Sequence, residues 1–292
     1  MNVLIIGNSI SGRGKTTQRV DKLAGMLKYN GHNVEVFLSS KPRDALIRAA
    51  SIGADLQRVV IAGGDGTVNE VLNGLADPSI VPIVHLATGT ANMFARELGL
   101  PTSVSETARL VETGRILPVD MGVVSGRRFL LVASVGFDSF VTLQMTETRK
   151  QALGYRGYLR PIFKAGLRYR HTSLKVSVDN QEPVTGEMVM VLKTRYYGGL
   201  FIFDEEARPN SGFFHVRVFP RGTLKSILKY GVAGLARQIC RFHDVIRLKA
   251  TCVRIESQSK MPLQVDGDHC CWTPAEIRIH PCLVPIVVPS MA

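Results

Sequence analysis

The residues best suited to chemistry lie in a glycine-rich turn, Gly63 to Thr67, with the sequence "GGDGT". An apolar run precedes it, and a helical pattern, "VNEVLNGLA", follows it. Glycines let a backbone approach a polyphosphate closely, and the N-terminus of the next helix would present N–H groups and the positive end of its dipole. Asp65 would repel phosphate unless Mg²⁺ lies between them or backbone N–H groups hold it. We expect it to act on a magnesium-bound nucleotide, directly or through water; the alternative is a turn former in a common Asp-Gly pair.

A second loop of the same kind follows the next apolar run, in "HLATGTANMF". In a parallel sheet, loops after neighbouring strands emerge at the same edge, where ligands bind. Ser39 and the loop that starts at Asn8 should emerge at this edge as well. Helix capping by Thr90 or Asn92 is an alternative use of the second loop, and it is compatible with ligand binding.

The loop after the first apolar run, "GNSISGRGKTT", has the end of a P-loop but not its beginning. The P-loop pattern requires a glycine five positions before Gly14, and Ser9 stands there. The sequence therefore does not predict an ordinary P-loop NTPase. It predicts a basic loop near a helix start, or a plain connection between strand and helix.

The elements that must position these loops alternate between strand and helix over about the first 120 residues. Apolar runs such as "NVLIIG", "RVVIAG" and "VPIVHLA" are separated by helical patterns, which favours an α/β domain with a parallel sheet. The second half instead holds β-branched runs between turn residues, typical of an antiparallel sandwich or barrel. Helix candidates interrupt it at residues 150–170 and 222–243. We expect a nucleotide-binding domain at 1–122, a β-rich lipid-substrate domain at 123–280, and a tail, 281–292, that packs on the first.

Composition and charge narrow the classes of protein. The 292 residues carry a net charge of +12. Residues 1–125 hold 12 Lys and Arg against 11 Asp and Glu, and residues 126–292 hold 24 against 13. The second half should therefore face an anionic partner. The five cysteines have no C-x-x-C spacing, so neither a disulfide framework nor a zinc site is expected. No apolar stretch long enough to span a membrane and no leader pattern is visible, and we expect a cytoplasmic protein.

The longer blocks "GGDGTVNEVLNGL" and "ATGTANMFARELGLP" resemble the diacylglycerol kinase catalytic family, in its bacterial lipid kinase branch, which is related to sphingosine and ceramide kinases. The resemblance covers essentially the whole chain and includes "NSISGRGK", "VDMGVVSGRRFLLVASVGFDSFV", "RYYGGLF" and "PLQVDGDH". GGDGT alone also occurs in NAD kinases and phosphofructokinases. The resemblance implies an NAD kinase/diacylglycerol kinase-like α/β domain with a mainly antiparallel β-sandwich, and transfer of the ATP γ-phosphate to a lipid hydroxyl with Mg²⁺.

The resemblance also implies a site. The residues expected at the nucleotide are Asn8, Ser39, Gly63, Gly64, Asp65, Gly66, Thr67, Val68, Asn69, Glu70, Thr88, Gly89, Thr90 and Asn92. The family has an Asp-Gly-Glu segment, implicated as the catalytic base and its partner, where this chain has Asp266-Gly267-Asp268. Either Asp266 or Asp268 is the expected base, and the sequence does not separate them. The side chain at 268 is one methylene shorter than glutamate, and a plain D-G hairpin turn is the alternative.

One departure from the family concerns a structural Mg²⁺. The family usually holds it with an Asp-Asp-Gly or Asn-Asp-Gly segment and backbone carbonyls, and this chain has Asn210-Ser211-Gly212. The carbonyls of Arg208 and Phe213 would remain, but a hard divalent ion prefers anionic oxygen. We expect this site to be weak or absent. The three acids just upstream, at 204–206, are expected to be surface charges.

The basic half suits a membrane surface. Arg156, Arg160, Lys164 and Arg168 recur every fourth residue beside an apolar row, and "RGTLKSILKYGVAGLARQICRFHDVIRLK" is also basic. Such stripes suit an anionic lipid interface, and a solvated helix face is the alternative. Nucleic acid is not expected, because no recognition module is present. The leading hypothesis is a cytoplasmic, membrane-peripheral lipid kinase. A soluble NAD kinase-type enzyme and a non-catalytic nucleotide-sensing regulator are the alternatives, and a homodimer is left open.

Overall fold

The computed structural model describes residues 1–144, 162, 165–166 and 168–290. The chain divides into two compact units, residues 1–121 with 281–292, and residues 122–280. The C-terminal strand therefore belongs to the same unit as the N-terminus, through hydrogen bonds with two strands of the first sheet.

The first unit is built on one six-stranded sheet with the order β2-β1-β3-β4-β20-β5. Its neighbours pair in parallel from β2 to β20, and β5 pairs antiparallel with β20. The central strands are buried on both faces, which explains their continuous apolar sequences. The strands are β1 (Asn2–Asn8), β2 (Asn33–Ser39), β3 (Arg58–Gly63), β4 (Ile83–Ala87), β5 (Arg115–Val119) and β20 (Val284–Val288).

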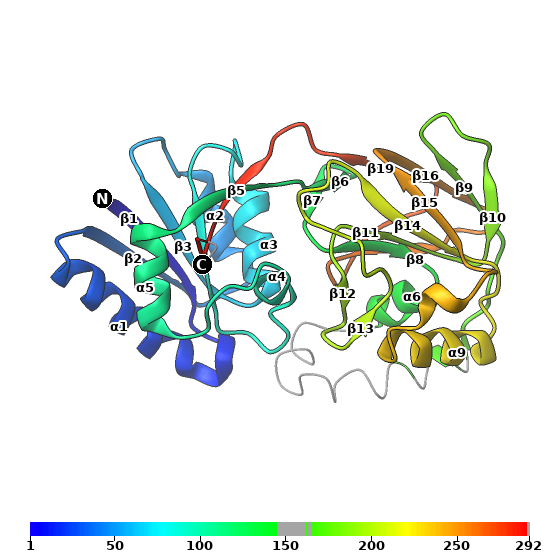
Figure 1. Ribbon diagram of the computed structural model, residues 1–292, viewed down its shortest axis with the longest axis horizontal. Helices are drawn as coiled ribbons and strands as arrows, with labels where there is room; N and C mark the ends of the chain where they lie inside the picture. The colour runs from blue at the N-terminus through cyan, green and yellow to red at the C-terminus, as the bar shows by residue number, and fades with distance from the viewer. Residues whose placement is uncertain (145–161, 163–164, 167, 291–292) are drawn as a thin grey trace. The chain divides into compact units, whose positions relative to one another are not determined.

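Helices cover both faces of this sheet (Figure 1). The long helix α1 and helix α5 pack against each other, as do α2 and α3. Helix α1 buries Val20, Leu23 and Leu27, at the spacing that the sequence shows. The helices are α1 (Lys15–Tyr29), α2 (Asp44–Ala50), α3 (Asp65–Gly74), α4 (Met93–Glu97) and α5 (Val104–Thr113), with a 3-10 turn, η1, at Ser11–Gly14.

The second unit contains two six-stranded antiparallel sheets with a shared apolar core. One has the order β10-β9-β16-β19-β6-β7: β6 (Gly122–Val124), β7 (Arg127–Phe129), β9 (Leu174–Val178), β10 (Val184–Gly186), β16 (Cys252–Ser257) and β19 (Ala275–Ile279). The other has the order β15-β14-β11-β8-β17-β18: β8 (Val132–Val135), β11 (Met188–Leu192), β14 (Phe214–Phe219), β15 (Ile246–Ala250), β17 (Pro262–Val265) and β18 (Asp268–Trp272). The fold class expected for both halves of the sequence is confirmed.

Among the described residues, the smaller elements of the second unit include a hairpin and two helices. The hairpin consists of β12 (Tyr196–Tyr197) and β13 (Phe201–Ile202), and the helices are α6 (Phe137–Leu143) and α9 (Leu224–Leu235). The helix predicted for 222–243 thus ends early, and a separate 3-10 turn, η3, covers Ile239–Arg241. The helix predicted for 150–170 lies almost entirely outside the described residues.

Three apolar runs that look continuous in the sequence are each divided between two sheets. "RRFLLVASVGF" forms β7 and β8, "DVIRLKATCVRIES" forms β15 and β16, and "EIRIHPCLVPIVVP" forms β19 and β20. A run of β-branched residues marks extended chain but does not mark where it changes sheet. At two of these crossings an aspartate fixes the turn, because Asp179 accepts hydrogen bonds from Thr251 N–H and Cys252 N–H, and Asp266 does the same for the crossing from β7 to β8.

Candidate functional site

The two glycine loops of the first unit lie directly against each other. Thr88 N–H donates to the Gly63 carbonyl at 2.9 Å, which joins the loop after β4 to the loop after β3. A Cβ atom on Gly89 would lie 2.5 Å from the Cα of Gly64, a separation that real side chains do not reach. Position 89 therefore needs glycine, and the two loops form one surface at the carboxyl end of the sheet, as the parallel pairing predicts.

The Asp65 carboxylate is held by backbone N–H groups. Its Oδ2 accepts from Met93 N–H at 2.9 Å and its Oδ1 accepts from Phe94 N–H at 3.0 Å. These are the first two residues of α4, so Asp65 satisfies helix N–H groups that lack partners within the helix. Asp65 thus ties the second loop to the first. Its contact with a magnesium ion stays a prediction.

Several predicted nucleotide residues hold strand ends together. The Thr16 hydroxyl donates to the Thr88 hydroxyl at 2.8 Å, and the Ser39 hydroxyl donates to the Gly7 carbonyl at 3.2 Å. Asn8 Nδ2 donates to the Thr67 hydroxyl at 3.4 Å. The predicted residues divide into exposed (Gly66, Thr90), half-buried (Asn8, Gly64, Asp65, Glu70, Gly89, Asn92) and buried (Ser39, Gly63, Thr67, Val68, Asn69, Thr88).

His85, on β4, is a buried titratable group beneath these loops that the sequence did not single out. Its Nε2 lies 3.1 Å from the Gly63 carbonyl. Burial lowers the pKa of His85 from its ordinary value, although the nearby Asp65 charge and the Gly63 hydrogen bond act in the opposite direction. A neutral imidazole that donates to Gly63 fixes the end of β3, from which the glycine turn starts.

The acidic turn of the second unit is a two-residue hairpin loop, Asp266-Gly267, between β17 and β18. Both residues have left-handed φ angles, 49° and 88°, as a type I′ turn requires. The Asp266 carboxylate accepts from Leu130 N–H at 3.0 Å, Leu131 N–H at 2.9 Å and Val132 N–H at 3.0 Å. The D-G hairpin that the sequence offered as an alternative is therefore the local structure, and Asp266 anchors it to the neighbouring strand.

Asp268, the other carboxylate of this turn, has different surroundings. Its side chain is 42% exposed, and its Oδ2 lies 3.1 Å from Arg127 Nη2. Arg127 also donates to the His269 carbonyl, which orients the guanidinium beside the hairpin. The accessible carboxylate of the turn is thus Asp268, and the amide-bound one is Asp266.

A second half-buried acid in this unit, Asp138 on α6, escaped the sequence analysis as a site residue. Its Oδ2 accepts from the Tyr197 hydroxyl at 2.7 Å and also from the Ser134 hydroxyl. The buried Gln264, two residues before the acidic turn, donates through Nε2 to Ser134 Oγ at 2.6 Å. Asp138 stands in the Gly-Phe-Asp block of the family resemblance, which was the signal that could have identified it.

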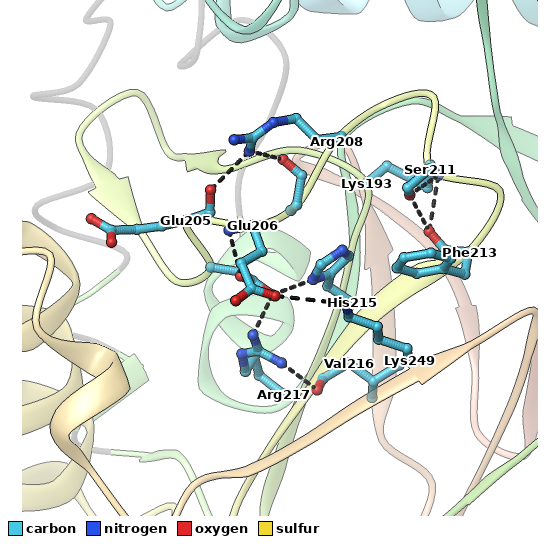
Figure 2. A network of polar contacts seen from close by, with 12 residues as sticks. Lys193, Glu205, Glu206, Arg208, Ser211, Phe213, His215, Val216, Arg217 and Lys249 are labelled. Atoms are coloured by element: carbon cyan, nitrogen blue, oxygen red, sulfur yellow. Dashed lines mark hydrogen bonds and ion pairs between the residues drawn. The ribbon is translucent and has the colours of Figure 1, made fainter.

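The expectation that Asp204 is a surface charge is wrong. Its side chain is 2% exposed and accepts from His215 Nδ1 at 2.6 Å and from Arg217. These two partners are labelled in Figure 2. Burial alone would raise the pKa of Asp204, but the His215 hydrogen bond, the Arg217 charge and the Glu206 amide bring it below its ordinary value. His215 and Arg217 are two residues apart on one face of β14. The local sequence around Asp204 does not show that the fold brings them to it. Glu205 and Glu206 are exposed, as expected.

At the Asn210-Ser211-Gly212 segment, where the resemblance implies a structural Mg²⁺, the structure places the side chain of Lys193, which follows β11. Lys193 Nζ donates to the Phe213 carbonyl at 3.0 Å and to the Ser211 hydroxyl at 3.3 Å (Figure 2). Within the described part of the chain, no group of three or more His, Cys, Asp and Glu side chains could hold a metal ion. An ammonium group among these oxygens disfavours a divalent cation, so the residues present do not fit the metal.

Helix α9 presents an unusual outer face. Four apolar side chains on it are half-exposed or more: Leu224 at 50%, Leu228 at 62%, Val232 at 66% and Leu235 at 51%. Their spacing of four, four and three residues places them in one stripe. Lys225 and Lys229, both exposed, each follow a stripe residue, about 100° around the helix. The basic row at 156–164 lies outside the described residues, and Arg168 is exposed. No helix among the described residues is long and apolar enough to cross a membrane.

Comparison with known families matches both units. Residues 2–124 match the diacylglycerol kinase catalytic domain, and residues 131–288 match the YegS C-terminal NAD kinase beta sandwich-like domain. The diacylglycerol kinase of Bacillus subtilis (strain 168) is 27% identical over 277 residues, which cover 93% of this chain and 91% of that protein. The diacylglycerol kinase of Mycobacterium tuberculosis (strain H37Rv) is 26% identical over 296 residues, which cover 98% and 95%.

Solved structures share the fold. A putative diacylglycerol kinase from Bacillus anthracis aligns with a TM-score of 0.81 at 22% identity, over 98% of this chain and 95% of that one. An NAD kinase from Archaeoglobus fulgidus in complex with ATP aligns with a TM-score of 0.57 at 12% identity, over 98% and 93%. At 22% and 12% identity, these alignments support the fold of the two units and nothing beyond it.

Proposed function

This chain belongs to the diacylglycerol kinase catalytic domain family, and on that premise we propose that it transfers the γ-phosphate of ATP to the hydroxyl of a diacylglycerol-like lipid. Family membership supports a kinase that uses ATP. The observation that favours a lipid over a soluble acceptor is the α9 stripe, where Leu228 and Val232 are more than 60% exposed beside two lysines. Exposed apolar side chains flanked by basic ones suit the surface of an anionic membrane.

The nucleotide would bind at the joined glycine loops. The turn from Gly64 to Thr67 offers a close backbone approach and the N-terminus of α3, which together suit the phosphates of Mg²⁺–ATP. The buried hydroxyls of Ser39 and Thr88 hold the surrounding strand ends, so the backbone and the exposed Thr90 are better placed for direct contact. The metal would arrive with the nucleotide and neutralise charge on the phosphates. Asp65 would hold the second loop against the first in the arrangement that binds this ligand.

Asp268 is the better candidate for the catalytic base. Asp266 accepts three backbone N–H groups, two at Oδ1 and one at Oδ2, which favour its charged form and fix it in place. Asp268 is accessible, and Arg127 orients it. In the proposed reaction the lipid hydroxyl oxygen forms a bond to the γ-phosphorus, the bond to the bridging oxygen breaks, ADP leaves, and Asp268 takes the hydroxyl proton.

The acceptor is tested with γ-labelled ATP, Mg²⁺ and a panel of diacylglycerol, sphingoid base and NAD, the lipids being supplied in phosphatidylglycerol vesicles. We expect label in a lipid product and none in NADP. Label in NADP alone would favour the soluble NAD kinase-type alternative. Label in neither would favour the nucleotide-sensing regulator.

The membrane surface is tested by sedimentation with the same vesicles. Leu228→Asp should reduce the bound fraction and leave the melting temperature unchanged, because this side chain is 62% exposed. Ile47→Asp is the matched control, since Ile47 is 67% exposed on α2 in the first unit. Equal loss of binding in the two variants would argue against α9 as the docking face.

A further inference from the structure

The buried ammonium of Lys193 donates hydrogen bonds to two oxygens of the 211–213 segment. The residue is fully buried, at 0% exposure, directly after β11. Besides the Phe213 carbonyl and the Ser211 hydroxyl, its Nζ lies 6.0 Å from the centroid of the Phe214 ring. Burying a charged group away from water costs folding free energy unless the group is hydrogen-bonded. These contacts therefore offset the cost of burying Lys193 in the unit.

The oxygens around this ammonium correspond to those that the family gives to a metal. Ser211 stands at the position of the family's metal-binding carboxylate, and the Phe213 carbonyl is one of the backbone ligands expected from the resemblance. The Ser211 hydroxyl also donates to that carbonyl at 2.9 Å, so the carbonyl receives two donors. The ammonium thus joins the 208–213 segment to the end of β11, as Figure 2 shows.

Replacing a metal ion and its aspartate with a lysine and a serine would also leave the local charge unchanged. A divalent cation with one carboxylate gives a local charge of +1, and an ammonium with a neutral hydroxyl gives the same value. We propose that Lys193 takes the place of the structural divalent cation, and that Lys193 and Ser211 form one coupled replacement for metal and aspartate. The unit then keeps its loop in place without a metal there. This inference concerns the fold and stands whether or not the chain phosphorylates a lipid.

The first test measures the melting temperature of the full-length wild-type protein, without nucleotide, in EDTA and across a series of MgCl2 and CaCl2 concentrations. We expect the melting temperature to be the same throughout, to about 1 °C. A structural ion well above its dissociation constant would raise it by about 5 °C or more. A saturable rise of that size, lost in Ser211→Ala, would overturn the proposal.

The second test changes the pair. Lys193→Met should lower the melting temperature in all solutions, because the two oxygens lose their cation. Lys193→Met combined with Ser211→Asp should regain stability with Mg²⁺ or Ca²⁺ and lose it in EDTA. Lys249→Met is the matched control, since Lys249 also lies near Phe213, 5.1 Å from the ring centroid, but its side chain is 57% exposed.

These variants can contradict the proposal in two ways. A Lys193→Met protein that melts within about 1 °C of Lys249→Met would show that the ammonium holds nothing in place. A double variant that folds but gains no dependence on divalent cations would show that the ammonium and the ion do not share one position. If Lys193→Met cannot be purified, the wild-type titration and the double variant in Mg²⁺ still test whether the ammonium replaces the ion.

Discussion

The glycine turn of the first unit and the acidic turn of the second use an aspartate in the same way. Asp65 accepts two backbone N–H groups from the start of α4, and Asp266 accepts three from the crossing into β8. Both carboxylates therefore fix a turn to a segment that is distant in the sequence. The turns differ in what they leave accessible, which is mainly backbone at Gly64 to Thr67 and a carboxylate, Asp268, at the hairpin.

This comparison teaches that an aspartate in a glycine-containing turn is not automatically the reacting group. A carboxylate that accepts several N–H groups holds a turn in place, and the more exposed neighbouring acid is the one that we propose as the base. The following predictions test this difference, from the largest expected effect on stability to the smallest.

Removal of the Asp266 carboxylate should be the most damaging change. Asp266→Ala leaves three N–H groups without their charged acceptor, and each such bond is worth about 1.5–3 kcal/mol. We expect the free energy of unfolding in urea to fall by about 3 kcal/mol or more. Asp268→Ala removes a partly exposed ion pair and should cost less than about 1 kcal/mol. Equal losses in the two variants would abolish the distinction between them.

The next largest loss of stability is expected where the two glycine loops approach each other closely. Gly89→Ala would place a Cβ 2.5 Å from the Gly64 backbone, and we expect a loss of about 1–3 kcal/mol as the loops separate. Gly25→Ala is the control, because its Cβ would meet nothing within 4 Å on the exposed side of α1, and it should stabilise the helix by about 0.5–1 kcal/mol. A neutral Gly89→Ala would mean that the two loops are not held together as described.

Asp204 extends the comparison, because its partners are the guanidinium of Arg217 and the imidazole of His215 as well as a backbone amide. The His215 hydrogen bond and Arg217 charge outweigh burial and depress its pKa below the ordinary 3.8. A depressed pKa contributes stability that is present above the unfolded value and is lost as pH falls through the folded value. Urea titrations from pH 5 to pH 2 should therefore show a steeper acid loss for wild type than for Asp204→Asn. Parallel curves would rule out this linkage.

The sequence located both turns but did not show which hydrogen bonds their carboxylate oxygens accept. Glycine spacing and the alternation of elements place Gly63–Thr67 after a parallel strand, and the D-G pair predicts the hairpin. The N–H groups that hold Asp65 come from α4, 28 residues or more along the chain, and those that hold Asp266 come from more than 130 residues away. No local pattern reports such contacts.

Two buried charges were missed for the same reason. Asp204 is one of three consecutive acids that we expected at the surface, and the sequence did not single out Lys193. Each is explained only by residues that the fold brings to it, His215 and Arg217 for the first, Ser211 and Phe213 for the second. The departure of the Asn-Ser-Gly segment from the family pattern was a signal, but it is explained only by the contact of Ser211 with Lys193.

The most direct test of the central claim is the initial rate of label transfer from γ-labelled ATP to diacylglycerol in anionic vesicles, compared between wild type and Asp268→Asn. Asp21→Asn, an exposed carboxylate on α1, serves as the control, and melting temperatures are matched. We expect wild type and the control to form labelled phosphatidic acid at the same rate, and Asp268→Asn to be at least about 100-fold slower with its fold intact. A wild-type protein that labels no lipid, or an Asp268→Asn variant within about threefold of wild type, would contradict it.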